Sequence, residues 1–397
     1  MKFSSKIQNC GYSPIRKFYP YQVACKKRGV NIVPLNIGQP DIKTPDAYTD
    51  VLKNFDIDVL AYAPSPGIPE LLEAVKKYYN KVGVPVETSD ILVTTGGSEA
   101  LTIALSCILD DGDELMIPEP FYPNYSTFTN LTGGKIHPIP TSPAENYKYA
   151  VREKLESCLT PHTRAMMRTN PGNPTGYVLT QEEMRIIADF VKEHDLFLIA
   201  DEVYREFVYS DKPLSSFGTF DDIKDNVILI DSVSKRFSAC GARIGCMISR
   251  NKELVAHAMK ICQARLCCAT IDQTVATALY GIDFSYFDDV KVEYMKRRDT
   301  LYNGLKAIPG VTLSNPEGAF YMMATLPVDD TDKFQQWLLE EFSYEGETVM
   351  YAPAAGFYGT PGAGKNEIRC AYVIDCELLE KACMLLGKAI EAYNNRQ

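Results

Sequence analysis

Residues 227–235 read VILIDSVSK, a short apolar run followed by two serines and a lysine. An uninterrupted apolar run of this length is typical of a strand that is buried in a parallel sheet. Lys235 then follows the carboxyl end of that strand, where open parallel sheets place their functional groups. Taken alone, Lys235 is better explained as a solvated surface lysine, because lysines are usually exposed, so its context has to decide.

Similar apolar runs recur through the middle of the chain, separated by longer amphipathic stretches. The runs cover residues 91–95, 114–118, 165–169, 196–200, 227–231 and 244–249. Residues 180–194 have apolar side chains at helical spacing and begin with Thr180 and Glu183, the two residues of a capping box. The alternation predicts an α/β fold with a mostly parallel sheet and helices on both of its faces.

The sequence pattern changes after about residue 284, where a long charged stretch is followed by a second helix-rich region. A chain of 397 residues also exceeds the usual size of one domain. We therefore expect a large domain over residues 46–285 and a smaller α+β domain built from residues 1–45 and 286–397.

Composition excludes several classes of protein. The net charge is −10 and no Lys/Arg-rich run occurs, which argues against a nucleic-acid partner. No apolar stretch is long enough to span a bilayer and the first residues lack a signal-peptide pattern, so we expect no membrane association and a cytoplasmic location. The twelve cysteines are scattered and the four histidines lack metal-site spacing, which predicts reduced thiols and no metal.

Three further polar segments follow predicted strands. TTGGSEA (94–100) has two glycines before an apolar helix, so its backbone N–H groups are suited to an anion such as phosphate, although a plain tight turn is the alternative. NPGNPTG (170–176) could be a simple Pro/Gly turn. DEVY (201–204) places a carboxylate at a strand end, where a helix cap is the competing explanation.

Together, the four segments occur in an order that is far more specific than any one of them. GGSEA, NPGNPTG, DEVY and SVSK followed by Arg243 resemble the class I/II aminotransferases that depend on pyridoxal 5′-phosphate (PLP). The resemblance extends from Gly38, in LNIGQPD, to Arg369, in EIRCAYV. It implies the fold-type-I PLP transferase fold and PLP as the cofactor.

The resemblance also implies roles for individual residues around the cofactor. Lys235 would form the covalent bond to PLP and move the substrate's α-proton, while Asp201 would pair with the pyridine nitrogen. Asn173 and Tyr204 match the donors to the phenolate oxygen, and Tyr122 matches the ring that stacks on the pyridine. The positions that match the phosphate-binding residues are Gly97, Ser98, Ser232, Ser234 and Arg243, with Tyr62 lent by the partner subunit of a homodimer.

Substrate binding follows from the same resemblance. Arg369 matches the arginine that binds the substrate's α-carboxylate, with Gly38 and Asn173 beside it. Arg265 lies near the place where some members carry a second arginine for dicarboxylates. GTPGAGKN (359–366) comes within one residue of a phosphate-binding P-loop, but Asn366 replaces the required Ser/Thr and a strand-like run follows, so we reject that interpretation.

The predicted function is an aminotransferase that moves an amino group from an amino acid, aspartate or aromatic, to 2-oxoglutarate by a ping-pong mechanism. One alternative stays open at this stage, and a second is disfavoured. The same scaffold supports β-lyases and decarboxylases. A PLP-sensing regulator would need a DNA-binding extension in front of the family-like segment, which begins by residue 38.

Overall fold

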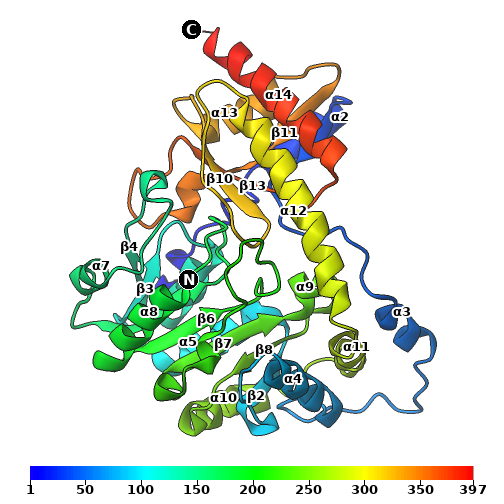
Figure 1. The fold of residues 1–397 in the computed structure, drawn as a ribbon, viewed down its shortest axis with the longest axis vertical. Helices are drawn as coiled ribbons and strands as arrows, with labels where there is room; N and C mark the ends of the chain where they lie inside the picture. The colour runs from blue at the N-terminus through cyan, green and yellow to red at the C-terminus, as the bar shows by residue number, and fades with distance from the viewer. Residues whose placement is uncertain (397) are drawn as a thin grey trace.

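The computed structural model describes residues 1–396 and is built around a seven-stranded sheet (Figure 1). The strand order is β2-β8-β7-β6-β5-β3-β4. The strands are β2 (Ile91–Thr94), β3 (Glu114–Pro118), β4 (Lys135–Ile139), β5 (Thr163–Thr169), β6 (Phe197–Asp201), β7 (Val227–Ser232) and β8 (Gly245–Ile248). Only β8 is antiparallel to its neighbours, which confirms the predicted mostly parallel sheet.

All six predicted strands are present, and the sequence missed β4. That strand is an edge strand whose residues Lys135–Ile139 include a histidine and Pro138 and are only partly buried. Edge strands tolerate proline and polar residues because one side of the strand has no partner. The apolar run that identifies a central strand is therefore absent from β4.

Helices cover both faces of the sheet, as predicted (Figure 1). One face packs against α5 (Gly96–Ile108), α6 (Asn124–Thr132) and α10 (Lys252–Arg265). The other packs against α4 (Pro69–Lys81), α7 (Arg152–Ser157), α8 (Gln181–Glu193) and α11 (Thr270–Tyr280). The predicted capping box of α8 is present, since the Glu183 amide donates to Thr180 Oγ1 at 3.1 Å and the Thr180 amide to Glu183 Oε2 at 2.9 Å.

A second hydrophobic core lies at the C-terminal part of the chain (Figure 1). Its strands are β1 (Asn31–Pro34), β9 (Thr312–Leu313), β10 (Tyr321–Thr325), β11 (Glu347–Met350), β12 (Ala352–Pro353) and β13 (Glu367–Ala371). Its helices include α12 (Ser285–Lys306), α13 (Thr331–Glu340) and α14 (Cys376–Asn394). Tyr204 and Phe207, which follow β6, also belong to this core, so the division at residues 45 and 285 stays a prediction.

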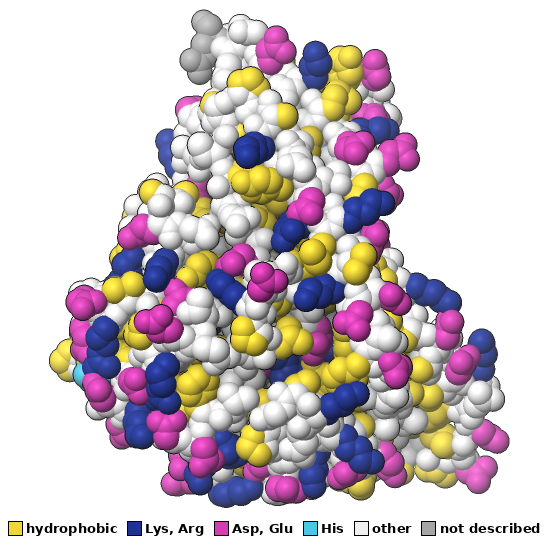
Figure 2. Space-filling model, viewed as in Figure 1, with side chains coloured by type: hydrophobic (Ala, Val, Ile, Leu, Met, Phe, Trp, Pro, Cys, Tyr) yellow, Lys and Arg dark blue, Asp and Glu magenta, His cyan; other side chains and the backbone are white. Residues whose placement is uncertain are grey.

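The remaining α-helices of the described residues are short: α1 (Ser5–Gln8), α2 (Tyr19–Lys27), α3 (Asp46–Lys53) and α9 (Val233–Arg236), the last of which directly follows β7 and is largely buried. In the space-filling view, Lys and Arg side chains are interspersed with Asp and Glu over the visible face (Figure 2). Within residues 1–396, none of the helices combines the length and the apolar character that a membrane crossing requires.

Candidate active site

The polar segments predicted from the sequence meet at one edge of the large sheet. Strands β5, β6 and β7 are parallel, so their carboxyl ends lie together. Strand β2 is antiparallel to β8, which is itself antiparallel to β7, so β2 also ends at this edge. For the same reason β8 begins there, which brings Arg243 close to the start of α5.

Asp201 is the last residue of β6 and is 6% exposed. Its carboxylate accepts hydrogen bonds from the Tyr125 hydroxyl at 2.6 Å and from the Val203 amide at 3.3 Å. It forms no ion pair with any side chain of residues 1–396. Burial raises the pKa of Asp201 to about 6, and the hydrogen bond from Tyr125 and the nearby charge of Lys235 partly oppose this shift.

Tyr125 and Thr169 were not predicted as site residues. The Tyr125 hydroxyl lies 2.6 Å from Thr169 Oγ1, and Thr169 is the register partner of Asp201 on the neighbouring strand. The strand-end position of Thr169 was a signal that could have found it. Tyr125 carries no such signal beyond its place three residues after Tyr122.

Lys235 lies on α9, the short helix that Ser232 caps through its hydroxyl. Its Nζ donates to the Gly38 carbonyl oxygen at 2.7 Å and lies 3.8 Å from Cys240 Sγ. Gly38 has to be glycine here, because a Cβ atom at that position would lie 1.8 Å from the Tyr321 hydroxyl. The amine is half-buried and faces the segment predicted to bind the substrate.

The start of α5 forms an anion cradle with the loop before β8. Gly96 has a φ of +74°, and a Cβ atom there would lie 2.4 Å from the Arg243 guanidinium. Arg243 donates to the carbonyls of Cys240 at 3.0 Å and Thr95 at 3.4 Å. The Ser232 and Ser234 hydroxyls lie 2.7 Å apart, and both belong to the adjoining strand end.

This donor set fits the phosphate of PLP. Gly97 and Ser98 lie in the first turn of a 13-residue helix, whose free N–H groups and dipole attract an anion. The guanidinium of Arg243 adds a cation, and it is exposed rather than engaged by a carboxylate within residues 1–396.

Arg369 lies on β13 and is 2% exposed. It donates to Asn173 Oδ1 at 3.2 Å and to the Asn36 carbonyl at 2.6 Å. Its guanidinium carbon is 4.4 Å from the Tyr321 ring centroid and 5.1 Å from that of Phe357. Across the described residues, 1–396, its Nε has no hydrogen-bond partner and the guanidinium no carboxylate partner.

The other predicted side chains are grouped between Asp201 and Arg369. The Tyr122 ring packs edge-on against Tyr125 at 5.4 Å, and its hydroxyl accepts a hydrogen bond from Asn124 at 2.7 Å. The Tyr204 hydroxyl lies 2.9 Å from that of Tyr321, and both rings are buried. Asn36, Tyr321 and Phe357 were not predicted, because no motif marks them in the sequence.

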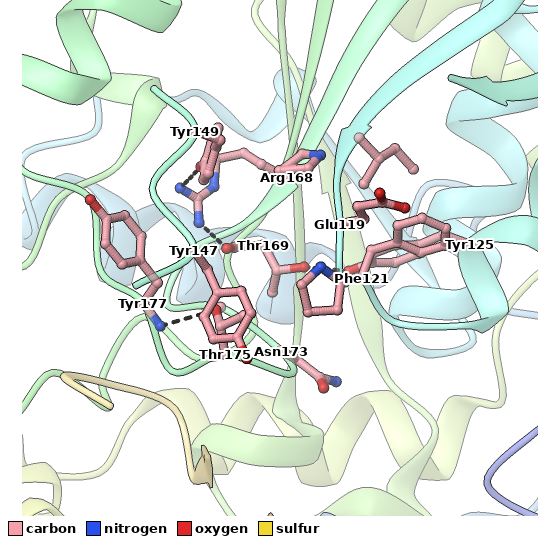
Figure 3. Close-up of a pocket in the computed structure, with 14 residues that line it drawn as sticks. Glu119, Phe121, Tyr125, Tyr147, Tyr149, Arg168, Thr169, Asn173, Thr175 and Tyr177 are labelled. Carbon is pink, nitrogen blue, oxygen red and sulfur yellow. Dashed lines mark hydrogen bonds between the residues drawn. The ribbon is translucent and has the colours of Figure 1, made fainter. Parts of the chain in front are cut away.

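A small cavity of about 30 Å³ lies beside the site (Figure 3). Thr169, Asn173 and Tyr125 line it on the side of the site, and Arg168 and Glu119 also border it. Arg168 hydrogen-bonds the Tyr149 hydroxyl and the Thr169 carbonyl. The volume is sufficient for a water molecule rather than for a substrate.

Two residues and one segment that the sequence analysis singled out lie outside this group. Arg265 binds Glu99 at 2.9 Å and the Ser65 carbonyl at 3.0 Å, so its guanidinium already has a carboxylate partner. Tyr62 is 81% exposed, in an open groove that it shares with residues 267–272. The segment 359–366 leads into strand β13 rather than a helix, which confirms that it is not a P-loop.

The edge of the sheet combines a free amine, a buried carboxylate without a cation partner and a cradle for an anion. These features are expected of a PLP-dependent enzyme. The comparison with protein families agrees: residues 30–349 match the family described as aminotransferase class I and II. The chain belongs to this family and is a PLP-dependent transaminase, which confirms the resemblance found in the sequence.

Individual relatives are similar over nearly their whole length. The chain is 35% identical to a Bacillus subtilis protein named probable N-acetyl-LL-diaminopimelate aminotransferase, over 92% of each chain. It is 30% identical to aromatic-amino-acid aminotransferase 2 of Thermococcus litoralis, over 98% of this chain and 99% of the relative. The crystal structure of a Thermotoga maritima aspartate aminotransferase superposes with a TM-score of 0.88 at 26% identity, over 98% of this chain and all of the other.

Proposed function

We propose that the enzyme transfers the amino group of aspartate or an aromatic amino acid to 2-oxoglutarate by a ping-pong mechanism. One observation carries this proposal. Arg369, which has no carboxylate partner within residues 1–396, and the half-buried Lys235 amine lie in the same site, and that site is typical of the family. The names of similar proteins include aspartate and aromatic-amino-acid aminotransferases, which supports this range of donors.

The residues at the sheet edge are suited to hold PLP by both of its charged ends. In our proposal Arg243, Ser232, Ser234 and the first turn of α5 bind the phosphate. Asp201 binds the protonated ring nitrogen, which supplies the cation that the buried carboxylate lacks. When bound, PLP acts as an electron sink that stabilises negative charge at the substrate's α-carbon.

Lys235 serves in this proposal as both the covalent anchor and the proton carrier. Its Nζ is held by the Gly38 carbonyl, 2.7 Å away, which directs the amine toward the substrate segment. There it can accept the α-proton of the amino acid and return a proton later in the reaction. Tyr204 and Asn173 are the proposed donors to the cofactor's phenolate oxygen.

Arg369 is the proposed binding site for the substrate's α-carboxylate, with Asn173 and Gly38 beside it. A buried guanidinium without a carboxylate is costly unless an anion compensates it, and a substrate carboxylate provides that anion in a planar, two-pronged contact. The Tyr122 ring would cover one face of the bound pyridine.

We further propose a homodimer with shared active sites. Tyr62 is exposed in the single chain, on a groove with an apolar border that includes Leu60 and Ile271, and in a dimer it would reach the phosphate of the other subunit. The division into domains at residues 45 and 285 is part of the same proposal. The twelve free cysteines support a cytoplasmic location, where thiols stay reduced.

A panel of amino acids with 2-oxoglutarate tests the function. We expect glutamate and the matching oxo acid as products, with aspartate or an aromatic amino acid as the best donor. Release of ammonia with pyruvate would instead indicate a β-lyase, and loss of carbon dioxide a decarboxylase. Borohydride reduction followed by peptide mapping should place PLP on Lys235.

A further inference from the structure

Glu119 ends the β3 strand region with a carboxylate that is 3% exposed. No lysine, arginine or histidine of residues 1–396 pairs with it. Instead Oε2 accepts hydrogen bonds from the amides of Gly359 at 2.9 Å and Thr360 at 3.0 Å, and Oε1 accepts one from Thr360 Oγ1 at 2.7 Å. A buried carboxylate therefore binds three donors of a single turn that lies more than two hundred residues away in the sequence.

At the tip of that turn the Glu119 carboxylate is the acceptor for both backbone amides. Gly359 and Thr360 are exposed, so burial of apolar surface does not fix them. The flanks of the turn are attached separately. The Phe121 amide donates to the Phe357 carbonyl at 2.8 Å, and the hydroxyls of Tyr147 and Tyr358 donate to Glu367 at 2.8 and 3.0 Å.

The turn carries Phe357, which is fully buried next to Arg369. The guanidinium of Arg369 is thus bordered by the rings of Phe357 and Tyr321, at 5.1 and 4.4 Å, while its nitrogens bind Asn173 and Asn36. Displacement of the turn would move Phe357 and free the guanidinium to change its orientation. Small displacements of a positioned group are enough to weaken substrate binding.

We propose that Glu119 is a positioning residue for substrate binding: by holding the turn at residues 357–360 it keeps Phe357 against Arg369 and so sets the affinity for the substrate's carboxylate. This inference rests on the proposed role of Arg369. Glu119 touches neither substrate nor cofactor in this proposal, and it acts only through the turn.

The test uses the holoenzyme with Glu119→Gln. The amide side chain can keep its carbonyl oxygen on the two backbone amides and place its NH₂ group on Thr360 Oγ1, so the hydrogen bonds remain but lose their charged acceptor, which weakens them. We expect KM for both the amino acid and 2-oxoglutarate to rise about tenfold, which corresponds to about 1.4 kcal/mol, with kcat within about twofold. The visible absorption of bound PLP should not change.

A second readout does not depend on catalysis. The Gly359 and Thr360 amides should exchange hydrogen faster in Glu119→Gln, with or without PLP, because a neutral acceptor replaces the charged one and holds them more weakly. Glu391→Gln, on the exposed face of α14, is the matched control and should alter neither KM nor exchange. Thr360→Val removes one donor with a similar shape and should raise KM by a smaller factor, whereas Thr360→Ser should restore it.

Arg369→Lys, measured in parallel, separates the two proposals. If Arg369→Lys leaves KM unchanged, the proposed carboxylate site is wrong and the role of Glu119 fails with it. If Arg369→Lys raises KM but Glu119→Gln does not, despite faster exchange of the two amides, only the role of Glu119 is overturned. Should Glu119→Gln fail to fold, Thr360→Val decides: a raised KM supports the role and an unchanged KM refutes it.

Discussion

Two buried aspartates end adjacent strands of the sheet, and they have opposite surroundings. Asp231, on β7, is fully buried and binds the Arg236 guanidinium at 2.8 Å and the Tyr79 hydroxyl at 2.8 Å. Asp201, on β6, is almost as deeply buried, but within residues 1–396 its carboxylate has only the Tyr125 hydroxyl and one amide as partners. The protein thus neutralises one carboxylate itself, and in our proposal the other pairs with the ring nitrogen of the cofactor.

The same contrast separates two arginines. Arg265 has its own carboxylate in Glu99, whereas Arg369 has only amide and carbonyl oxygens. Because a buried charge is costly without a counter-charge, the groups left without one are the best candidates for ligand binding. Residue type alone does not reveal which charged side chains have a counter-charge and which do not. Four predictions test this contrast.

The largest effect is expected at Lys235, whose amine donates to the Gly38 carbonyl at 2.7 Å. Lys235→Ala removes the proposed covalent anchor and proton carrier, so we expect kcat to fall by at least about a thousandfold. Steady-state assays with the best donor measure this. Turnover at the wild-type rate would show that another group carries the proton.

Asp201→Asn should impair catalysis while leaving the fold intact. The substitution removes the negative charge that we propose for the ring nitrogen, and we expect kcat to fall by about a hundredfold or more. A matched Asp231→Asn variant tests the assignment, since any catalytic loss there should accompany a loss of stability. Full activity of Asp201→Asn would mean that the cofactor needs no carboxylate at this position.

Asp231→Asn should mainly lower stability. The change breaks the close ion pair of the buried Arg236 guanidinium and leaves it the longer contact to Glu206 at 3.9 Å; breaking a buried pair typically costs about 3–5 kcal/mol. Denaturant unfolding of the enzyme measures this. An equally large loss of stability in Asp201→Asn would contradict the contrast between the two aspartates, because Asp201 has no buried cation as an ion-pair partner within residues 1–396.

The smallest effect concerns pH and the enzyme without PLP. The folded-state pKa of Asp201 is raised to about 6, above its unfolded value, so the ionised form is disfavoured and this residue destabilises the fold increasingly as pH rises. Apo Asp201→Asn should therefore be the more stable protein, by a margin that grows by about 1 kcal/mol between about pH 5 and pH 7.5. A margin that shrinks with rising pH would show that the carboxylate is stabilised in its charged form.

Much of the fold and of the site could be predicted from the sequence, for definite reasons. Apolar runs marked the buried strands, and the polar residues at their ends had to meet because parallel strands end at one edge. Strand β4 was missed because an edge strand carries no such run. Tyr321 and Phe357 were missed because they belong to distant segments whose contact with Arg369 is created only by folding.

The sequence by itself determined the order of strands and helices, the family, and the residue types at the sheet edge, since these depend on local periodicity and on ordered motifs. Only the tertiary structure decided which charges are neutralised within the protein. Asp231 pairs with Arg236, its neighbour in the fold five residues further along, and Arg265 pairs with Glu99 in a distant segment, while Asp201 and Arg369 have no counter-charge within residues 1–396. Whether two charged side chains pair depends on their distance and orientation in the folded chain, and local pattern carries no information about these.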